Sequence, residues 1–204
     1  MAFIISADDI KKNLPGYDPK HSDVLHRESA RLADKEFEKA LKSRQEIKVI
    51  LMSGGTASGK TEYVSSFLAN KSALVFDGTL PTLEGAKIKI KKAMKHGKKV
   101  EVHGVLPDDL LVAFIAFLNR DRKFPTEHFY RTHSQSRKTL LEIATNMPQV
   151  SIKIAVSYYE GSSSTSKMLF RLYDELKPPR MIEFLARNQY TEDEIKRIQR
   201  LYDI

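Results

Sequence analysis

Residues 54–61 read GGTASGKT and lie between an apolar run, IKVILMS at 47–53, and a helical pattern over about 61–70. The segment fits the spacing G-x-x-x-x-G-K-[ST]. Glycines let the backbone curl, so that several N–H groups converge on one anion. A strand before the loop and a helix after it are what this loop needs, because the start of the helix adds the positive end of its dipole. The pattern therefore predicts a phosphate-binding loop.

Short apolar runs alternate with helical patterns along the rest of the chain. The runs cover residues 3–6, 73–77, 100–106 and 150–158, and the patterns cover about 22–43, 83–96, 107–119 and 127–146. This alternation predicts parallel β-α-β units, and so an α/β sheet sandwiched by helices. Ligands of such sheets bind beyond the carboxyl ends of the strands. The acidic segment at 7–9, the loop at 54–61 and the segment at 77–79 all follow an expected strand.

The length of 204 residues predicts a single domain. We expect residues 1–177 to form its main body. After Lys177-Pro178-Pro179, residues 178–204 should form a helical appendage of the same domain, with short helices at about 180–187 and 191–203. The sequence predicts a packing or partner-binding role for this appendage.

The composition excludes several classes of site. The formal net charge of +8 and the pI near 9.5 favour polyanionic ligands. There is no cysteine, which excludes disulfides, thiolate catalysis and cysteine-based zinc sites. The longest apolar run, Leu110–Leu118, is too short to cross a bilayer, and the first residues make a poor signal peptide. We therefore expect a soluble cytoplasmic protein without a membrane role. The run GSSSTS at 161–166 predicts a flexible loop.

The loop predicts specific contacts with ATP and Mg²⁺. Lys60 supplies a mobile cation for the β- and γ-phosphates, and Thr61 supplies a hydroxyl for the metal. The expected nucleotide-binding residues are Gly54, Gly55, Thr56, Ala57, Ser58, Gly59, Lys60, Thr61 and Glu62.

A kinase also needs a base for the acceptor hydroxyl and cations for the moving phosphoryl group. The acids that follow expected strands, Asp8 and Asp77, are candidates for contact with the acceptor. Each also has a structural alternative, because Asp8 or Asp9 could cap a helix and Asp77 could sit in a turn. The guanine-specifying motif N-K-x-D is absent from the sequence, which argues against a GTPase.

Three segments resemble the zeta-toxin family of P-loop kinases. Residues 5–11, ISADDIK, resemble the family's I-D-x-D-x-F-R, and residues 76–79, FDGT, resemble a strand that ends in Glu-Gly-Thr. Residues 122–128, RKFPTEH, resemble Arg-x-x-Pro-x-Glu-His. The resemblance covers most of residues 3–160, but the acidic strand precedes the loop here and follows it in the family. The order of the matching segments along the chain therefore looks circularly permuted relative to the family.

The resemblance implies an ATP-dependent kinase of small molecules, whose best-known family acceptor is UDP-N-acetylglucosamine. It implies that Asp8 is the catalytic base and that Arg120 and Arg122 clamp the phosphates with Lys60. It further implies acceptor contacts from Lys11, Asp77, Gly78 and Thr79. An antitoxin-type protein partner is implied by the family alone. Asp77 replaces the family's glutamate, and the closer spacing of the two arginines implies a trimmed lid.

Two other functions stay open at this point. A polynucleotide or RNA kinase is encouraged by the net charge and by a run of lysines over 87–99. We expect Lys87, Lys91, Lys95 and Lys98 to share a helix face opposite Ile90, Ala93 and Met94, and a solvated face is the simpler interpretation. A non-catalytic ATP-binding module is the second alternative. Solvated loop positions are the structural alternative for Arg120 and Arg122. The spacing of the histidines predicts no structural metal site.

Overall fold

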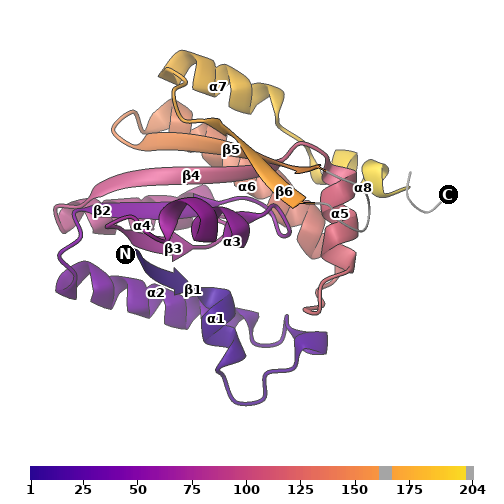
Figure 1. Cartoon of the computed structure of the whole chain (residues 1–204), viewed down its shortest axis with the longest axis horizontal. Coiled ribbons are helices and arrows are strands. Elements are labelled where there is room, and N and C mark those ends of the chain that lie inside the picture. Colours follow the sequence, from indigo (N-terminus) through magenta and orange to yellow (C-terminus); the bar gives the residue numbers. More distant parts are fainter. Residues whose placement is uncertain (161–166, 201–204) are drawn as a thin grey trace.

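A mostly parallel sheet forms the centre of the protein, as the computed structural model of residues 1–160 and 167–200 shows (Figure 1). Over these described residues it has six strands in the order β1-β3-β2-β4-β5-β6. Neighbours among the first five are parallel, and β6 runs antiparallel to β5. The strands are β1 (Phe3–Ser6), β2 (Lys48–Ser53), β3 (Leu74–Asp77), β4 (Lys99–Pro107), β5 (Ser151–Glu160) and β6 (Lys167–Tyr173).

The predicted strands are confirmed, with small shifts at their ends, and β6 is an addition. β2 is buried from its second residue to its last, as expected for a strand with neighbours on both sides and covered faces. β6 is an edge strand whose residues are all exposed or half-buried, and the prediction missed it although residues 168–170 are apolar. The predicted loop at 161–166 lies outside the described residues.

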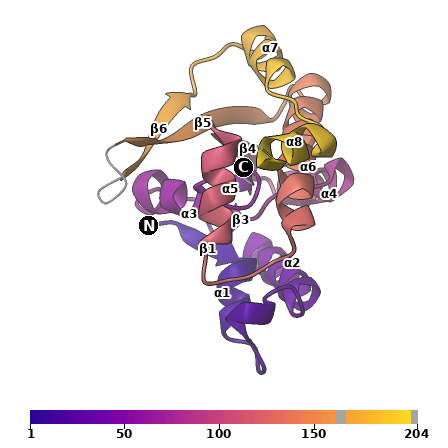
Figure 2. The ribbon, with the colours of Figure 1, turned by 90° about the vertical axis from the view of Figure 1, so that its right-hand side faces the viewer.

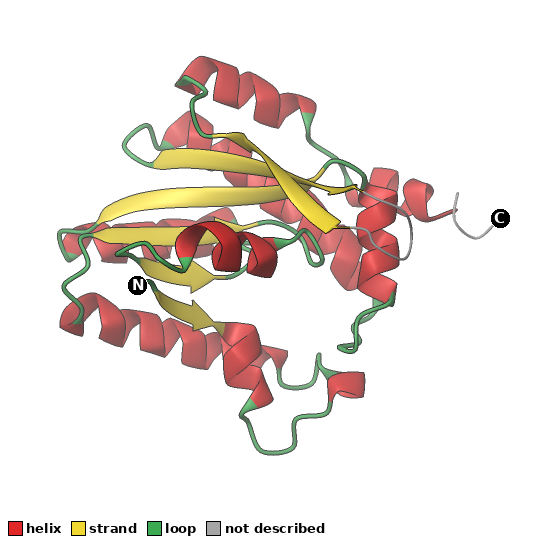
Figure 3. Cartoon of the chain, viewed as in Figure 1, coloured by secondary structure: helices red, strands yellow, loops and turns green. Residues whose placement is uncertain are grey.

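The expected α/β class is confirmed, and helices alternate with the strands (Figure 3). Each helical pattern of the sequence corresponds to a helix of similar extent. The helices are α1 (Ala7–Lys12), α2 (His26–Ser43), α3 (Lys60–Tyr63), α4 (Leu83–Lys95), α5 (Leu110–Leu118), α6 (Thr126–Asn146), α7 (Pro178–Arg187) and α8 (Glu192–Arg200). A 3-10 turn, η1 (Pro19–His21), precedes α2, and a π-helical turn, η2 (Val64–Leu68), continues α3.

Two helix boundaries differ from the prediction for local reasons. α2 begins at His26 and not near residue 22, because Asp18 and Pro19 start the separate turn η1. α1 was not predicted: Ser6 caps it, and its side-chain oxygen accepts a hydrogen bond from the Asp9 amide at 3.2 Å. The acids that were offered as helix caps therefore lie inside the first turn of α1.

The two faces of the sheet are covered unequally. Val49 and Leu51 of β2 belong to the larger core, which packs against α2, α4, α6 and α7. Ile50 and Met52 point to the other face, which α3 and η2 cover. Figure 2 shows α3 on one side of the sheet and α2, α4 and α6 on the other. The arrangement is compatible with a Rossmann-like or P-loop-like fold.

The C-terminal helices pack on the same body. Met181 and Leu185 of α7 are buried in the larger core, and Ile195 of α8 is buried among aromatic side chains of α5 and α6. Residues 201–203 of the expected last helix lie outside the described ranges. None of the helices in those ranges is both long and apolar enough to cross a membrane.

The strand order brings three chain segments together beyond the carboxyl ends of neighbouring strands. β1 comes first in the chain, but β3 separates it from β2. Ser6 at the end of β1 pairs with Asp77 at the end of β3, and Leu51 of β2 pairs with Phe76. Because these strands are parallel, the segments that follow β1, β2 and β3 meet beyond their carboxyl ends.

Candidate active site

The loop at 54–61 has the backbone geometry of a tight phosphate-binding turn. Gly54 and Gly59 have φ values of +144° and +86°, and Ala57 has φ +59°, which is uncommon outside glycine. A Cβ on Gly54 would collide with the carbonyl oxygen of Val105, and one on Gly55 would collide with the ring of His133. The loop therefore lies directly against β4 and α6, with no room for side chains at its first two positions.

Lys60 is the first residue of α3, and its side chain folds back over the loop. The Nζ atom donates hydrogen bonds to the carbonyl oxygens of Gly54 at 2.9 Å and Gly55 at 2.7 Å. Burial lowers the pKa of Lys60 to about 8, although the Asp77 carboxylate opposes that shift. The ammonium group is thus held at the mouth of the loop and titrates close to neutral pH.

Thr56 is held from three sides. Its amide donates to the Thr132 hydroxyl at 3.1 Å, and its own hydroxyl accepts from an Nη atom of Arg120 at 2.9 Å. The Nε2 atom of His133 lies 2.8 Å from the Thr56 carbonyl oxygen, which can only accept. His133 therefore donates here, and burial keeps its pKa well below the usual value, so the ring is neutral. Sequence reasoning missed Thr132 and His133 as supports of the loop.

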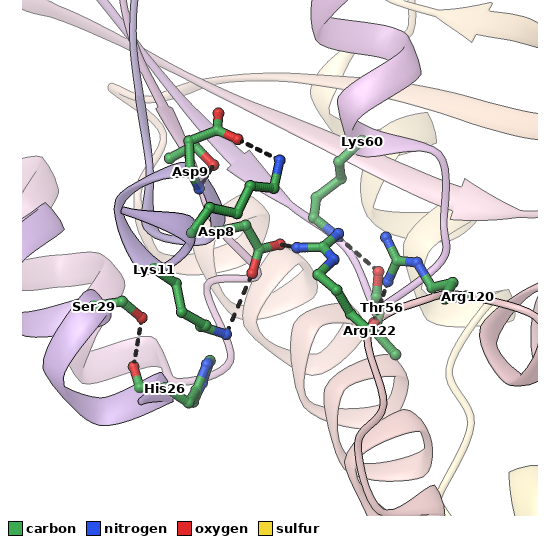
Figure 4. Close-up of polar contacts among 12 residues, drawn as sticks. Asp8, Asp9, Lys11, His26, Ser29, Thr56, Lys60, Arg120 and Arg122 are labelled. Carbon is green, nitrogen blue, oxygen red and sulfur yellow. Dashed lines mark hydrogen bonds and ion pairs between the residues drawn. The ribbon is translucent and has the colours of Figure 1, made fainter. Parts of the chain in front are cut away.

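Asp8 lies in the first turn of α1 and faces the loop (Figure 4). Its carboxylate accepts from Arg122 at 2.5 Å and from Lys11 at 3.5 Å. Burial by itself raises the pKa of Asp8, but the charges of Arg122 and Lys11 outweigh burial, so the pKa lies below its usual value. Asp8 is therefore an ionised carboxylate, paired with an arginine of the connection between α5 and α6.

Asp9 and Lys11, which were also singled out in the sequence, do not line the cleft. Asp9 is exposed and pairs with Lys12 at 2.9 Å. The side chain of Lys11 is 1% exposed and lies over the ring of Phe124, 4.8 Å from its centroid. Lys11 is not among the residues that line the cleft, so its contact with the site runs through Asp8.

Asp77 ends β3 and faces the cleft beside the loop. Burial raises the pKa of Asp77 above its usual value, although Lys60 opposes that shift. The carbonyl oxygen of Thr79 accepts from the Ser53 hydroxyl at 3.3 Å and from the Gly54 amide at 3.4 Å. The segment at 77–79 is thereby fixed to the start of the loop.

These side chains surround one cleft of about 490 Å³. It is lined by Asp8, residues 56–62, residues 77–79, Arg120 and Arg122, which were all singled out in the sequence. Gly54 and Gly55 lie beneath it. Sequence reasoning did not assign the other polar and aromatic lining residues, which are His26, Asp34, Phe76, Lys89, Phe124, His128, Tyr159 and Met168.

An aromatic cluster forms one wall beside Asp8. Phe124 stacks on His128 with ring centroids 4.6 Å apart, and His26 meets both rings edge-on. Burial lowers the pKa of His128 to about 4 and also lowers the pKa of His26, so both rings are neutral at pH 7. His21, in contrast, is exposed and pairs with Asp18.

Among the described residues, no group of three or more His, Asp or Glu side chains is arranged to hold a metal ion.

The lysine run is only partly a helix face. Lys87, Lys91 and Lys95 lie on α4, and Ile90 and Ala93 are buried on its other side, as predicted. Lys98 does not share that face, which corrects the prediction. α4 ends at Lys95, Gly97 has φ +69°, and Nζ of Lys98 donates to the carbonyl oxygens of Arg44 and Glu46.

No protein-family model matches the chain, and a search of curated proteins found no match. A lysine, two arginines and a glycine-rich loop face an ionised carboxylate and a half-buried one across one cleft. This combination suits an anionic ligand next to a group that loses a proton.

Proposed function

We propose that the chain is a phosphotransferase that moves the γ-phosphate of ATP to a hydroxyl group of a small molecule. One observation carries the proposal: the loop at 54–61 opens into the same cleft as Asp8, Asp77, Arg120 and Arg122. A phosphate-binding loop alone would serve any nucleotide-binding protein. The carboxylate and the two arginines facing it supply what phosphoryl transfer needs in addition.

The residues present fit magnesium-bound ATP. The loop curls with two glycines at positive φ, and the Ser58 hydroxyl is buried without a hydrogen-bond partner in the described part of the chain. Thr61 lines the cleft, and its hydroxyl is the expected metal ligand. Magnesium keeps several waters and takes few protein ligands at such sites, so a cage of carboxylates is not required. Magnesium-bound ATP supplies the transferable phosphoryl group.

The residues of the chain then have separate roles in the transfer. Asp8 accepts the proton of the acceptor hydroxyl, since it is ionised and reaches the cleft. Lys60, Arg120 and Arg122 balance the negative charge of the phosphates. Arg122 has to exchange its contact with Asp8 for the phosphates, which frees the carboxylate. Asp77 and Thr79 orient the acceptor from the end of β3.

The resemblance to zeta-toxin kinases is consistent with this proposal. The block order differs, but the strand order β1-β3-β2 sets the acidic strand two places from the loop strand, with β3 between them. The changed chain order therefore leaves Asp8, Asp77 and Lys60 facing one cleft. Kinship with that family, and the antitoxin-type partner that it would imply, are parts of the same proposal.

A phosphotransfer assay tests the proposed activity. The full chain is incubated with γ-labelled ATP, Mg²⁺ and a panel of free sugars, nucleotide sugars, nucleosides and short RNAs, with Lys60→Ala alongside. We expect label on a small-molecule alcohol, and none with the variant. Label on RNA alone would move the function to a polynucleotide kinase. Tight ATP binding without transfer to any member would favour a non-catalytic module.

A further inference from the structure

The cleft extends to both sides of the loop at 54–61. Towards β5 and β6 it is lined by Tyr159 and Met168. On the other side, towards β1 and β3, lies a region that we call the acceptor half, because it adjoins Asp8 and Asp77. Its lining residues are His26, Ala30 and Asp34 of α2, residues 76–82, Gly85, Ala86 and Lys89 of α4, and the pair Phe124 and His128.

The acceptor half offers no uncommitted cation. Lys89 is the one lysine or arginine among its described lining residues, and its Nζ lies 2.7 Å from a carboxylate oxygen of Asp34. The Lys89 side chain is 15% exposed and also lies over the ring of Phe76. Lys11 is buried behind Asp8, and Arg122 is paired with Asp8. No lysine or arginine in this half is therefore free to hold a phosphate of the acceptor.

Three carboxylates adjoin the same space, and the cations beside two of them are already paired: Lys89 with Asp34, and Arg122 and Lys11 with Asp8. Asp34 and Asp77 line the acceptor half, and Asp8 stands at its border. The two histidines do not offset them, because burial keeps the pKa of His26 and His128 below its usual value. Like charges repel each other, and water weakens this repulsion where the carboxylates are half-exposed, as those of Asp8 and Asp34 are. A phosphate-bearing acceptor would meet these carboxylates, while Lys60, Arg120 and Arg122 serve the phosphates of ATP.

The rest of the lining suits a ring that carries hydroxyl groups. Phe76, Phe124 and His128 give this half aromatic walls, in which Lys89 covers the ring of Phe76 and Phe124 stacks on His128. Asp34 accepts hydrogen bonds and Lys89 donates them, so their ion pair can hold two hydroxyl groups that lie side by side. Apolar walls with a few placed polar groups are the usual construction of a small-molecule site.

We propose that the acceptor is an uncharged polyol, such as a free sugar or a nucleoside, and not a nucleotide sugar or a nucleic-acid end. The inference rests on the proposed function. In the transfer, the acceptor oxygen bonds to the γ-phosphorus as the bond from that phosphorus to the β,γ-bridging oxygen breaks. Asp8 takes the hydroxyl proton, and ADP leaves.

Matched pairs of compounds test the inference by binding alone. Uridine is compared with UMP, and N-acetylglucosamine with UDP-N-acetylglucosamine, by saturation-transfer NMR on the full chain with a non-hydrolysable ATP analogue present. We expect the neutral member of a pair to bind about tenfold more tightly, which corresponds to a repulsion of about 1.4 kcal/mol. Equal or tighter binding of the phosphorylated member, or no binding of either pair, would overturn the inference.

The variant Asp34→Asn tests whether charge causes the preference of the acceptor half for neutral compounds. It releases Lys89 from its ion pair, so the neutral compound should bind more weakly and the phosphorylated one more tightly. A merely structural role of Asp34 would weaken both. Glu36→Gln is the matched control, because Glu36 is exposed on the same helix and does not line the cleft. If Asp34→Asn does not fold, Lys89→Met should likewise weaken binding of the neutral compound, and an unchanged affinity would count against the inference.

The two proposals fail in different ways. Transfer of label to UDP-N-acetylglucosamine in preference to neutral compounds would overturn the inference and leave the phosphotransferase standing. Preferential binding of neutral compounds without transfer of label to any acceptor would contradict the phosphotransferase and leave the charge preference of the acceptor half intact.

Discussion

At the scale of single residues, the cations of the site already hold polar contacts within the protein. Lys60 bonds to two carbonyl oxygens of its own loop, and Arg122 bonds to Asp8. These contacts stabilise charges that are partly buried, because a buried charge without a polar partner destabilises the fold. Ligand binding must therefore exchange these contacts for contacts with the ligand.

The charge state of Lys60 predicts a pH dependence of nucleotide binding. Burial lowers the pKa of Lys60 to about 8, so the ammonium group is present at pH 7 and is lost as the pH rises through 8. Phosphates favour the charged form, so ATP affinity should fall above pH 8 by up to about tenfold per pH unit. Isothermal titration calorimetry from pH 7 to pH 9.5 measures this. Lys60→Arg keeps its charge and should flatten the profile; an equally steep profile would assign the effect to another group.

Asp8→Asn separates proton transfer from nucleotide binding. The amide cannot take the acceptor proton, so transfer should fall by roughly 10²-fold or more. ATP affinity should stay unchanged or rise, because Arg122 loses its carboxylate partner. Transfer of label and calorimetry measure the two effects. Asp9→Asn is the control with the same change on an exposed neighbour; a wild-type rate in Asp8→Asn would remove Asp8 from the mechanism.

At the scale of elements, α6 acts as the support of the loop at 54–61. Thr132 and His133 lie in the first half of this helix and bond the amide and carbonyl groups of Thr56. The ring of His133 also occupies the space beside Gly55. The position of the loop therefore depends on a helix that begins more than sixty residues after it in the chain.

His133→Leu should loosen the loop without unfolding the protein. The variant removes one hydrogen bond to a buried carbonyl, which contributes about 1 kcal/mol, so ATP affinity should fall by about fivefold. His133→Gln retains a donor and should recover most of the loss. Calorimetry measures affinity, and thermal unfolding shows whether the fold persists. An affinity equal to wild type in the leucine variant would show that the bond does not set the loop geometry.

The local patterns predicted most of the elements and part of the site. The loop strand β2 was found because a buried parallel strand reads as an apolar run, and the loop follows it within a few residues. β6 was missed although residues 168–170 are apolar, because an antiparallel partner of β5 falls outside the alternation of strands and helices on which the prediction was based. His133, Thr132 and Lys89 were missed because their roles depend on partners distant in sequence, such as Thr56 and Asp34.

At the scale of the whole molecule, helix α7 shares the larger core with the sheet. Leu185 of α7 is fully buried in the same cluster as residues of α2, α4 and α6. A protein with one shared core unfolds in a single cooperative transition. Helix α7 (Pro178–Arg187) should therefore unfold together with the sheet.

Leu185→Ala tests this cooperativity. Truncating a buried leucine destabilises a fold by about 2–5 kcal/mol, so the variant should lower the free energy of unfolding by that amount while keeping one transition. Ile88→Ala, at an exposed position of α4, should change it by less than about 0.5 kcal/mol. Urea unfolding followed by circular dichroism measures both. A second transition in the Leu185 variant would show that α7 unfolds on its own.

The place of β1 at the edge of the sheet has a consequence for synthesis on the ribosome. Phe3 pairs with Leu74, and β3 is the sole neighbour of β1 in the described sheet. Because β1 is translated before β3, it must wait, unpaired, while α1, α2 and β2 are made. Nascent chains arrested before Asp77 has left the exit tunnel should leave residues 3–6 open to protease, and chains arrested after it should protect them. Early protection would mean that translation order does not limit the closing of this edge.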